Sequence, residues 1–157
     1  MESIDNVFEK LESKSNTLAA LIQTPIYTYL AVYGKTLQTL NKSGQRPYDW
    51  WTGHLSDIFA PAAEIALLYL ITNHFNENKH ERSTALKIFT IGLASYNTLI
   101  EFCNIDSKEH VFDNQDIVCF WTGAGIAYFG TKILSEKIND FLKNKYVDKL
   151  AKGDALK

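Results

Sequence analysis

The stretch FDNQDIVCFWTGAGIAYFG, residues 112–130, places two aspartates directly ahead of an apolar run punctuated by glycines. Asp113 and Asp116 come first, and residues 117–131 then carry no charged side chain. An apolar run of this kind predicts a membrane helix with carboxylates at its first turn. The remaining expectations for the fold depend on where similar runs recur.

Three more stretches without charged side chains follow this pattern, at residues 15–34, 65–76 and 88–100. A soluble amphipathic helix would carry lysine or glutamate about once a turn on its outer face. We therefore predict an all-α fold over residues 1–157, a single membrane domain with four transmembrane helices at 17–34, 55–74, 84–103 and 116–134. A soluble helical bundle is the alternative, because the mean hydropathy is slightly negative.

Two amphipathic segments flank the predicted four-helix transmembrane bundle. Residues 1–14 carry apolar side chains at helical spacing, and residues 135–152 form a lysine-rich helix. With four spans, both ends of the chain and the 76–87 region share one side, which holds twelve of the sixteen Lys and Arg residues. The positive-inside rule then predicts a multi-pass protein of the cell membrane with both termini and the basic C-terminal helix in the cytoplasm.

The same topology gathers ionisable side chains near the outer end of the bundle. Ionisable residues inside membrane bundles usually face the interior and often mark function. Clustered carboxylates could bind Ca²⁺ or Mg²⁺, or could share protons and bind a polar headgroup. The candidates for ligand or ion binding are His54, Asp57, Glu64, Glu101, Asp113 and Asp116.

Structural roles are the competing interpretation of these residues. Asp113, Asp116 and Asp57 are placed to stabilise the first turns of two helices. Glu101 and His54 could meet water or lipid headgroups at the interface. Glu64 is hardest to explain in this way, because it interrupts an apolar stretch.

Small residues recur on one face of the fourth predicted span. Gly123 and Ala127 are four residues apart, and Gly130 follows. Such residues let membrane helices approach closely, so we assign them to helix packing. Cys103 and Cys119 show no metal-binding spacing, and either a disulfide or two buried thiols would fit their predicted positions.

Motifs for common enzymes are missing from the chain. There is no nucleophile–base pair, phosphate-binding loop, dinucleotide fingerprint or zinc motif in the sequence. No cofactor is assigned, and a net charge of −2 does not suggest a nucleic-acid partner. The expected partners are the lipid bilayer and either other membrane proteins or further copies of the chain.

The segment NTLIEFCNIDSKEHVFDNQDIVCFWTGAGIAYFG, residues 97–130, resembles the C-terminal signature of VanZ-like membrane proteins. Asp57 in HLSDIF (54–59) looks like an earlier acidic position of that family. Asn104 stands where the family usually has glutamine, and Trp121 and Thr122 stand where it often has asparagine. The matching residues of the longer segment are Glu101, Phe112, Asp113, Asp116, Gly123 and Gly130.

The resemblance covers about residues 50–134 and implies a small integral membrane protein without a general catalytic mechanism. The named member of that family is linked to glycopeptide-antibiotic resistance. We therefore expect a non-enzymatic membrane protein with an acidic outer pocket. The alternatives are an accessory subunit of a larger membrane complex, and an envelope enzyme acting on a lipid-linked substrate.

Overall fold

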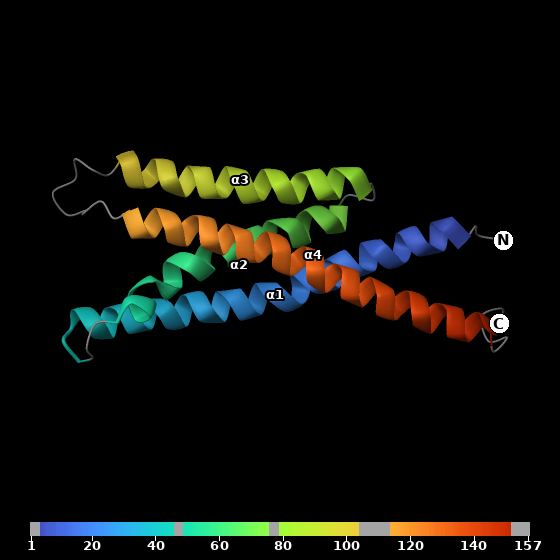
Figure 1. Ribbon diagram of the computed structural model, residues 1–157, viewed down its shortest axis with the longest axis horizontal. Helices are drawn as coiled ribbons and strands as arrows, with labels where there is room; N and C mark the ends of the chain where they lie inside the picture. Colours follow the sequence, from blue (N-terminus) through green and yellow to red (C-terminus); the bar gives the residue numbers. More distant parts are fainter. Residues whose placement is uncertain (1–3, 46–48, 76–78, 104–113, 152–157) are drawn as a thin grey trace.

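The computed structural model describes residues 4–45, 49–75, 79–103 and 114–151, and these form four α-helices. They run alternately up and down in an elongated bundle, which confirms the all-α class (Figure 1). The helices are α1 (Ile4–Lys42), α2 (Trp50–Phe75), α3 (Lys79–Cys103) and α4 (Asn114–Ala151). We call one end of the bundle the distal end; there α1 and α3 end, and α2 and α4 begin. The opposite end, where α1 begins and α4 ends, is the terminal end.

Two helices are longer than the sequence predicts. The amphipathic segment 1–14 and the first span join in α1, and the fourth span and the C-terminal segment join in α4. Polar residues at the first junction do not end the helix, because their hydroxyls bond within it. Ser15 Oγ donates to the Leu11 carbonyl at 2.7 Å, and Thr17 Oγ1 donates to the Ser13 carbonyl at 3.0 Å.

The two long helices project past α2 and α3 at the terminal end (Figure 1). They are joined there by an edge-to-face contact between Phe8 of α1 and Tyr146 of α4, whose ring centroids are 6.4 Å apart. The Nζ atom of Lys143 lies 5.4 Å from the centroid of the Phe8 ring. Tyr146 of the C-terminal segment therefore packs on the N-terminal segment, whereas Phe141 and Leu150 stay exposed.

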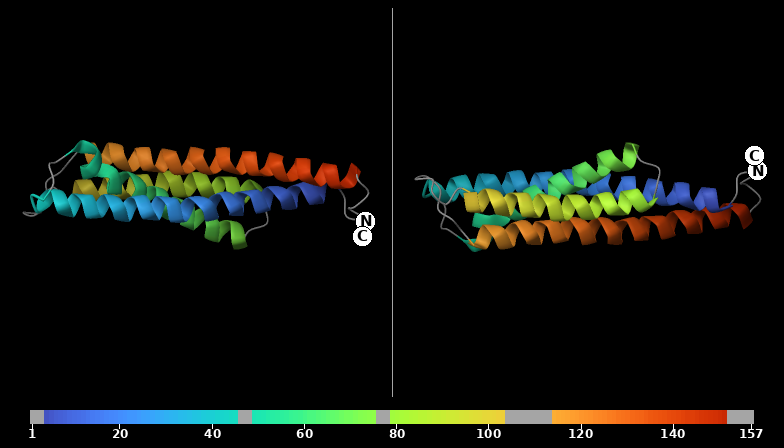
Figure 2. Two further views of the ribbon diagram at one scale, coloured as in Figure 1. Left: turned by 90° about the horizontal axis from the view of Figure 1, so that it is seen from below. Right: turned by 90° about the horizontal axis from the view of Figure 1, so that it is seen from above.

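The core of the bundle is built mainly from small side chains. α2 crosses the bundle diagonally (Figures 1 and 2), and buried residues extend along it from Thr52 to Asn73. Close packing depends on Gly34 of α1, where a Cβ would lie 2.5 Å from the backbone nitrogen of Ser56. Alanines dominate the buried cluster, which includes Ala20, Ala62, Ala66, Ala94, Ala124 and Ala127, together with Ile65 and Tyr69.

The small residues of α4 face two different helices. Gly123 faces Ile58 of α2, Ala127 is fully buried, and a Cβ at Gly130 would meet the side chains of Tyr27 and Gln23 on α1. α4 therefore approaches α2 in its first half and α1 further along the chain.

Two of the described helices, α2 and α4, are long and apolar enough to cross a membrane. α1 and α3 carry more polar side chains, such as Gln23, Thr24 and Thr28 on α1. Membrane association is supported to this extent. The four-span topology and the orientation remain predictions, which we develop below.

Candidate functional site

The distal end brings together the ends of all four helices (Figures 1 and 2). α2 begins at Trp50 directly after Asp49, whose Oδ1 accepts a hydrogen bond from the Trp51 backbone nitrogen at 3.2 Å. Asp49 is therefore the N-cap of α2. Asp57 lies two turns inside the helix, so the interpretation of Asp57 as a first-turn residue is wrong.

Three of the predicted ligand candidates meet at this end. His54 and Asp57 are three residues apart on one face of α2, and Asp116 lies in the first turn of α4. His54 Nδ1 is 3.1 Å from Asp116 Oδ1 and 3.7 Å from Asp57 Oδ2. One ligand atom from each residue lies within 4.8 Å of the other two. We call this group the distal cluster.

The burial of the distal cluster is uneven. The His54 side chain is 6% exposed, whereas those of Asp57 and Asp116 are 28% and 25% exposed. The imidazole therefore forms the floor of the cluster, and the two carboxylates keep access to solvent. A small polar ligand or an ion could reach them without displacing a helix.

The Asp57 carboxylate is held by hydrogen bonds from two neighbours. Gln38 Nε2, in the last turns of α1, donates to Asp57 Oδ2 at 3.2 Å and also to the carbonyl of Gly53. Ser56 Oγ donates to Asp57 Oδ1 at 3.2 Å. These bonds fix the orientation of the carboxylate and tie α1 to the first turns of α2.

The His54 ring is held by an aromatic neighbour. The ring of Trp50 lies 5.1 Å from that of His54, centroid to centroid. The indole Nε1 of Trp50 donates to Gln115 Oε1 at 2.7 Å, and Gln115 directly precedes Asp116 on α4. Trp50 thus links the histidine of α2 to the segment of α4 that carries the aspartate.

The other predicted candidates do not join the distal cluster. Glu101, at the end of α3, is 4% exposed but lies outside the group. Glu64 is exposed on α2, so the expectation that it faces the interior is wrong. Glu64 shares a helix face with Asp57, but at this level of α2 the next residues, Ile65 and Ala66, occupy the core instead. Asp113 lies outside the described residues.

Several residues near the cluster were not predicted from the sequence. Gln38 and Trp50 contact it directly, yet glutamine near a helix end and tryptophan near an interface are common in any membrane helix. Asp49 could have been recognised as a helix cap, because it directly precedes an apolar helical stretch.

Cys103 is exposed and Cys119 is buried, both as free thiols.

No family model, curated protein or solved structure matches this chain. The likeness to VanZ-like proteins therefore stays a prediction based on the sequence pattern. The roles as an accessory subunit or an envelope enzyme stay predictions as well. The proposals below depend on the geometry of the chain itself.

Proposed function

We propose that this chain is a small four-span membrane protein that binds a divalent metal cation at the distal cluster. The observation that supports the proposal most directly is the convergence of His54, Asp57 and Asp116. Ligand atoms bound to a cation at about 2.1 Å are separated by roughly 3–4.5 Å from one another. The separations in the distal cluster fall within or close to that range.

The chemistry of the cluster suits a borderline cation such as Zn²⁺ or Mn²⁺. Imidazole nitrogen favours zinc and similar transition metals, whereas Ca²⁺ and Mg²⁺ prefer oxygen ligands throughout. A neutral His54 and two ionised aspartates would balance the charge of a divalent ion. A cation bound between His54 Nδ1 and Asp116 Oδ1, which lie 3.1 Å apart, would replace any proton shared by these two atoms.

The surroundings of the cluster support a preorganised site. Carboxylates that bind metals are usually oriented by further hydrogen bonds, and loss of these bonds lowers the affinity for the metal. Gln38 and Ser56 have this relationship to Asp57, and Trp50 limits rotation of the His54 ring. Little rearrangement of protein would then be needed for binding.

Membrane insertion of all four helices is supported by the distribution of exposed apolar side chains. Soluble monomers seldom expose large contiguous apolar patches. On α1 and α4 most of the exposed large apolar side chains lie at residues 18–33 and 118–133, about 23 Å of helix length and a large part of the roughly 30 Å hydrocarbon core; Ile4, Phe141, Val147 and Leu150 lie beyond these ranges. We call this set the apolar belt: Leu18, Leu21, Ile22, Ile26, Tyr29, Val32, Tyr33, Leu67, Leu68, Ile71, Ile88, Ile91, Tyr96, Leu99, Ile100, Val118, Trp121, Ile126, Phe129 and Ile133.

Threonine hydroxyls within the belt region bond their own helices. On α1, Thr24 donates to the Ala20 carbonyl and Thr28 to the Thr24 carbonyl, both at 2.8 Å. Thr90 and Thr98 on α3 make the same kind of bond, at 2.7 and 2.8 Å. Because these hydroxyls already have hydrogen-bond partners in their own helices, they can enter a bilayer without water. The threonines of α1 and α3 are therefore compatible with a membrane span despite their low hydropathy.

Calorimetric titration of the detergent-purified protein with Zn²⁺ tests the metal site. We expect one ion per chain, with binding lost in His54→Ala and weakened at least tenfold in Asp57→Asn and Asp116→Asn. Glu64→Gln removes an acid from the same helix outside the cluster and should bind Zn²⁺ like the wild type. Equal affinity in all these variants would show that the distal cluster is structural.

Membrane insertion is tested separately by alkaline carbonate extraction of cell membranes. A four-span protein should remain with the lipid, and a reporter fused to the C-terminus should be active only in the cytoplasm. Release of the protein by carbonate would overturn the membrane part of the proposal without affecting the metal titration.

A further inference from the structure

A polar cavity lies at the other end of the bundle from the distal cluster. Its volume is about 450 Å³, within the roughly 300–1,000 Å³ of small-molecule sites, and residues of all four helices line it. We call it the terminal cavity. Its lining includes hydroxyl and amide groups from all four helices, among them Asn16 of α1 and Ser135 of α4, where Ser135 Oγ donates to Asn16 Oδ1.

Charged side chains at the terminal cavity leave a small positive excess. Lys87 of α3 and Lys132 and Lys143 of α4 line it, together with the two glutamates Glu12 and Glu136. Three cations from two helices and two carboxylates give one net positive charge. This balance fits a ligand with a single negative charge.

One acceptor at the cavity has no hydrogen-bond partner among the described residues. The Oδ1 atom of Asn139 is buried, and no other residue that the structure describes donates a hydrogen bond to it. Buried polar atoms are almost always satisfied, so a group from outside the chain is expected here. Oδ1 requires a donor, such as a hydroxyl group. The lysines and Asn139 together call for a ligand with both an anionic group and a hydrogen-bond donor.

The terminal cavity lies where the apolar belt ends. On α1, Glu12 and Asn16 precede Leu18, the first residue of the belt. On α3, Lys87 directly precedes Ile88, and on α4 the cavity residues extend from the end of the belt to Lys143. In a bilayer this level contains lipid headgroups, and basic pockets on the cytoplasmic side recognise anionic ones.

We infer that the terminal cavity binds the headgroup of an anionic phospholipid whose phosphodiester is linked to a hydroxyl-bearing group, as in phosphatidylglycerol. The phosphodiester supplies the single negative charge for the lysines, and the hydroxyls supply donors for Asn139 and the glutamates. This inference rests on membrane insertion in the proposed function, but it does not depend on the metal at the distal cluster.

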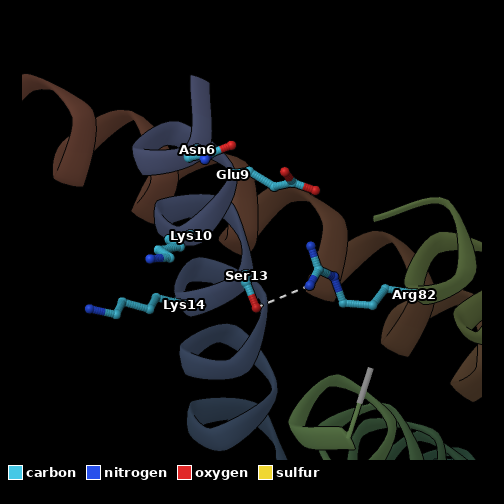
Figure 3. A pocket seen from close by; sticks show the side chains of 6 residues that line it. All are labelled: Asn6, Glu9, Lys10, Ser13, Lys14 and Arg82. Carbon is cyan, nitrogen blue, oxygen red and sulfur yellow. Dashed lines mark hydrogen bonds between the residues drawn. The ribbon is translucent and has the colours of Figure 1, made fainter. Parts of the chain in front are cut away.

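A neighbouring cavity of about 370 Å³ between α1 and α3 does not share these properties. Its floor is Arg82, which is 1% exposed and donates from Nη1 to Ser13 Oγ at 3.1 Å. Lys10 and Lys14 extend away from Arg82 on the other side of α1 (Figure 3). Its cations therefore do not converge on one ligand, and Arg82 serves to hold α3 against α1.

Native mass spectrometry of the protein in detergent, titrated with phosphatidylglycerol or phosphatidylethanolamine, tests the inference. We expect one phosphatidylglycerol bound preferentially, and about 30-fold weaker binding in Lys87→Gln/Lys132→Gln. The matched control is Lys137→Gln/Lys145→Gln, which removes two exposed lysines of α4 that do not line the cavity and should bind like the wild type. Free glycerol 3-phosphate, added in excess, should leave the bound lipid in place.

Three results would overturn the inference. They are equal binding of the two lipids, equal weakening in the cavity and control variants, and displacement of the lipid by free glycerol 3-phosphate. The last would identify a soluble phosphate ligand. Carbonate extraction and Zn²⁺ titration of the same variants report separately on insertion and on the distal cluster, so failure of the proposed function would be recognised as such.

Discussion

Gly123 of α4 faces Ile58 of α2 so closely that a Cβ at position 123 would lie 1.9 Å from the Ile58 carbonyl oxygen. Ile58 lies one turn beyond His54, and Gly123 lies two turns beyond Asp116. The contact therefore sets the distance between the two helices directly beside the distal cluster. Because the neighbour is backbone, a side chain at position 123 would have to push the helices apart.

Gly123→Ala should therefore weaken Zn²⁺ binding without changing any ligand. We expect a loss of about 1–3 kcal/mol in stability from overpacking, and at least tenfold weaker Zn²⁺ binding. Gly125→Ala is the control, because nothing lies within 4 Å of a Cβ at that position and alanine favours the helix. Thermal unfolding and calorimetry of both variants check the prediction, and unchanged affinity in Gly123→Ala would contradict it.

Gln38 should affect the metal through Asp57 rather than by binding it. Its Nε2 donates to Asp57 Oδ2, so Gln38→Met would leave only the Ser56 hydroxyl to orient the carboxylate and should lower Zn²⁺ affinity by about 10–100-fold. Thr36→Val, an exposed change on the same helix, should leave the affinity unchanged. If Gln38→Met binds Zn²⁺ like the wild type, the amide does not orient the site.

The sequence predicts the helical class because charge-free runs and small-residue spacing are local properties. It also predicts six ligand candidates at one end of the bundle, because helix ends that share one side lie together, and three of the six, His54, Asp57 and Asp116, meet in the structure. It does not predict that Glu64 is exposed on the surface of the bundle. Asp57 and Glu64 are seven residues apart and share a helix face, but only the tertiary packing of α2 decides that this face contacts Gln38 of α1 at Asp57 and is exposed at Glu64.

The full lengths of α1 and α4 could not be predicted, because the sequence does not show whether the helix continues where each amphipathic segment joins a predicted span. Ser15 and Thr17 resemble helix-ending residues in the sequence, but in the structure their hydroxyls bond carbonyls of the same helix. Gln38 and Asn139 carry no sequence signal either, since their roles arise only when a neighbouring helix is placed against them.

A buried hydrogen bond between α1 and α4 should contribute measurably to stability. Thr131 Oγ1 donates to Gln23 Oε1 at 2.7 Å, and both side chains are buried. Thr131→Val leaves the amide oxygen without this donor and should cost about 1–3 kcal/mol in unfolding free energy. Thr122→Val is the matched control, because the exposed Thr122 donates only to the Val118 carbonyl of its own helix. Equal thermal stability of the two variants would contradict the assignment.

Glu64 gives a test of membrane insertion that is independent of the proposed metal ion and the proposed lipid. It is exposed on α2 one turn before Leu67 and Leu68 of the apolar belt. A carboxyl group facing lipid at this level is unfavourable, so Glu64→Leu should raise the melting temperature in lipid nanodiscs by a few degrees. Asp140→Leu, an exposed change on α4 beyond the belt, should give no comparable gain. A lower melting temperature in Glu64→Leu, together with a change in oligomeric state by light scattering, would instead show that Glu64 contacts a second protein within the membrane.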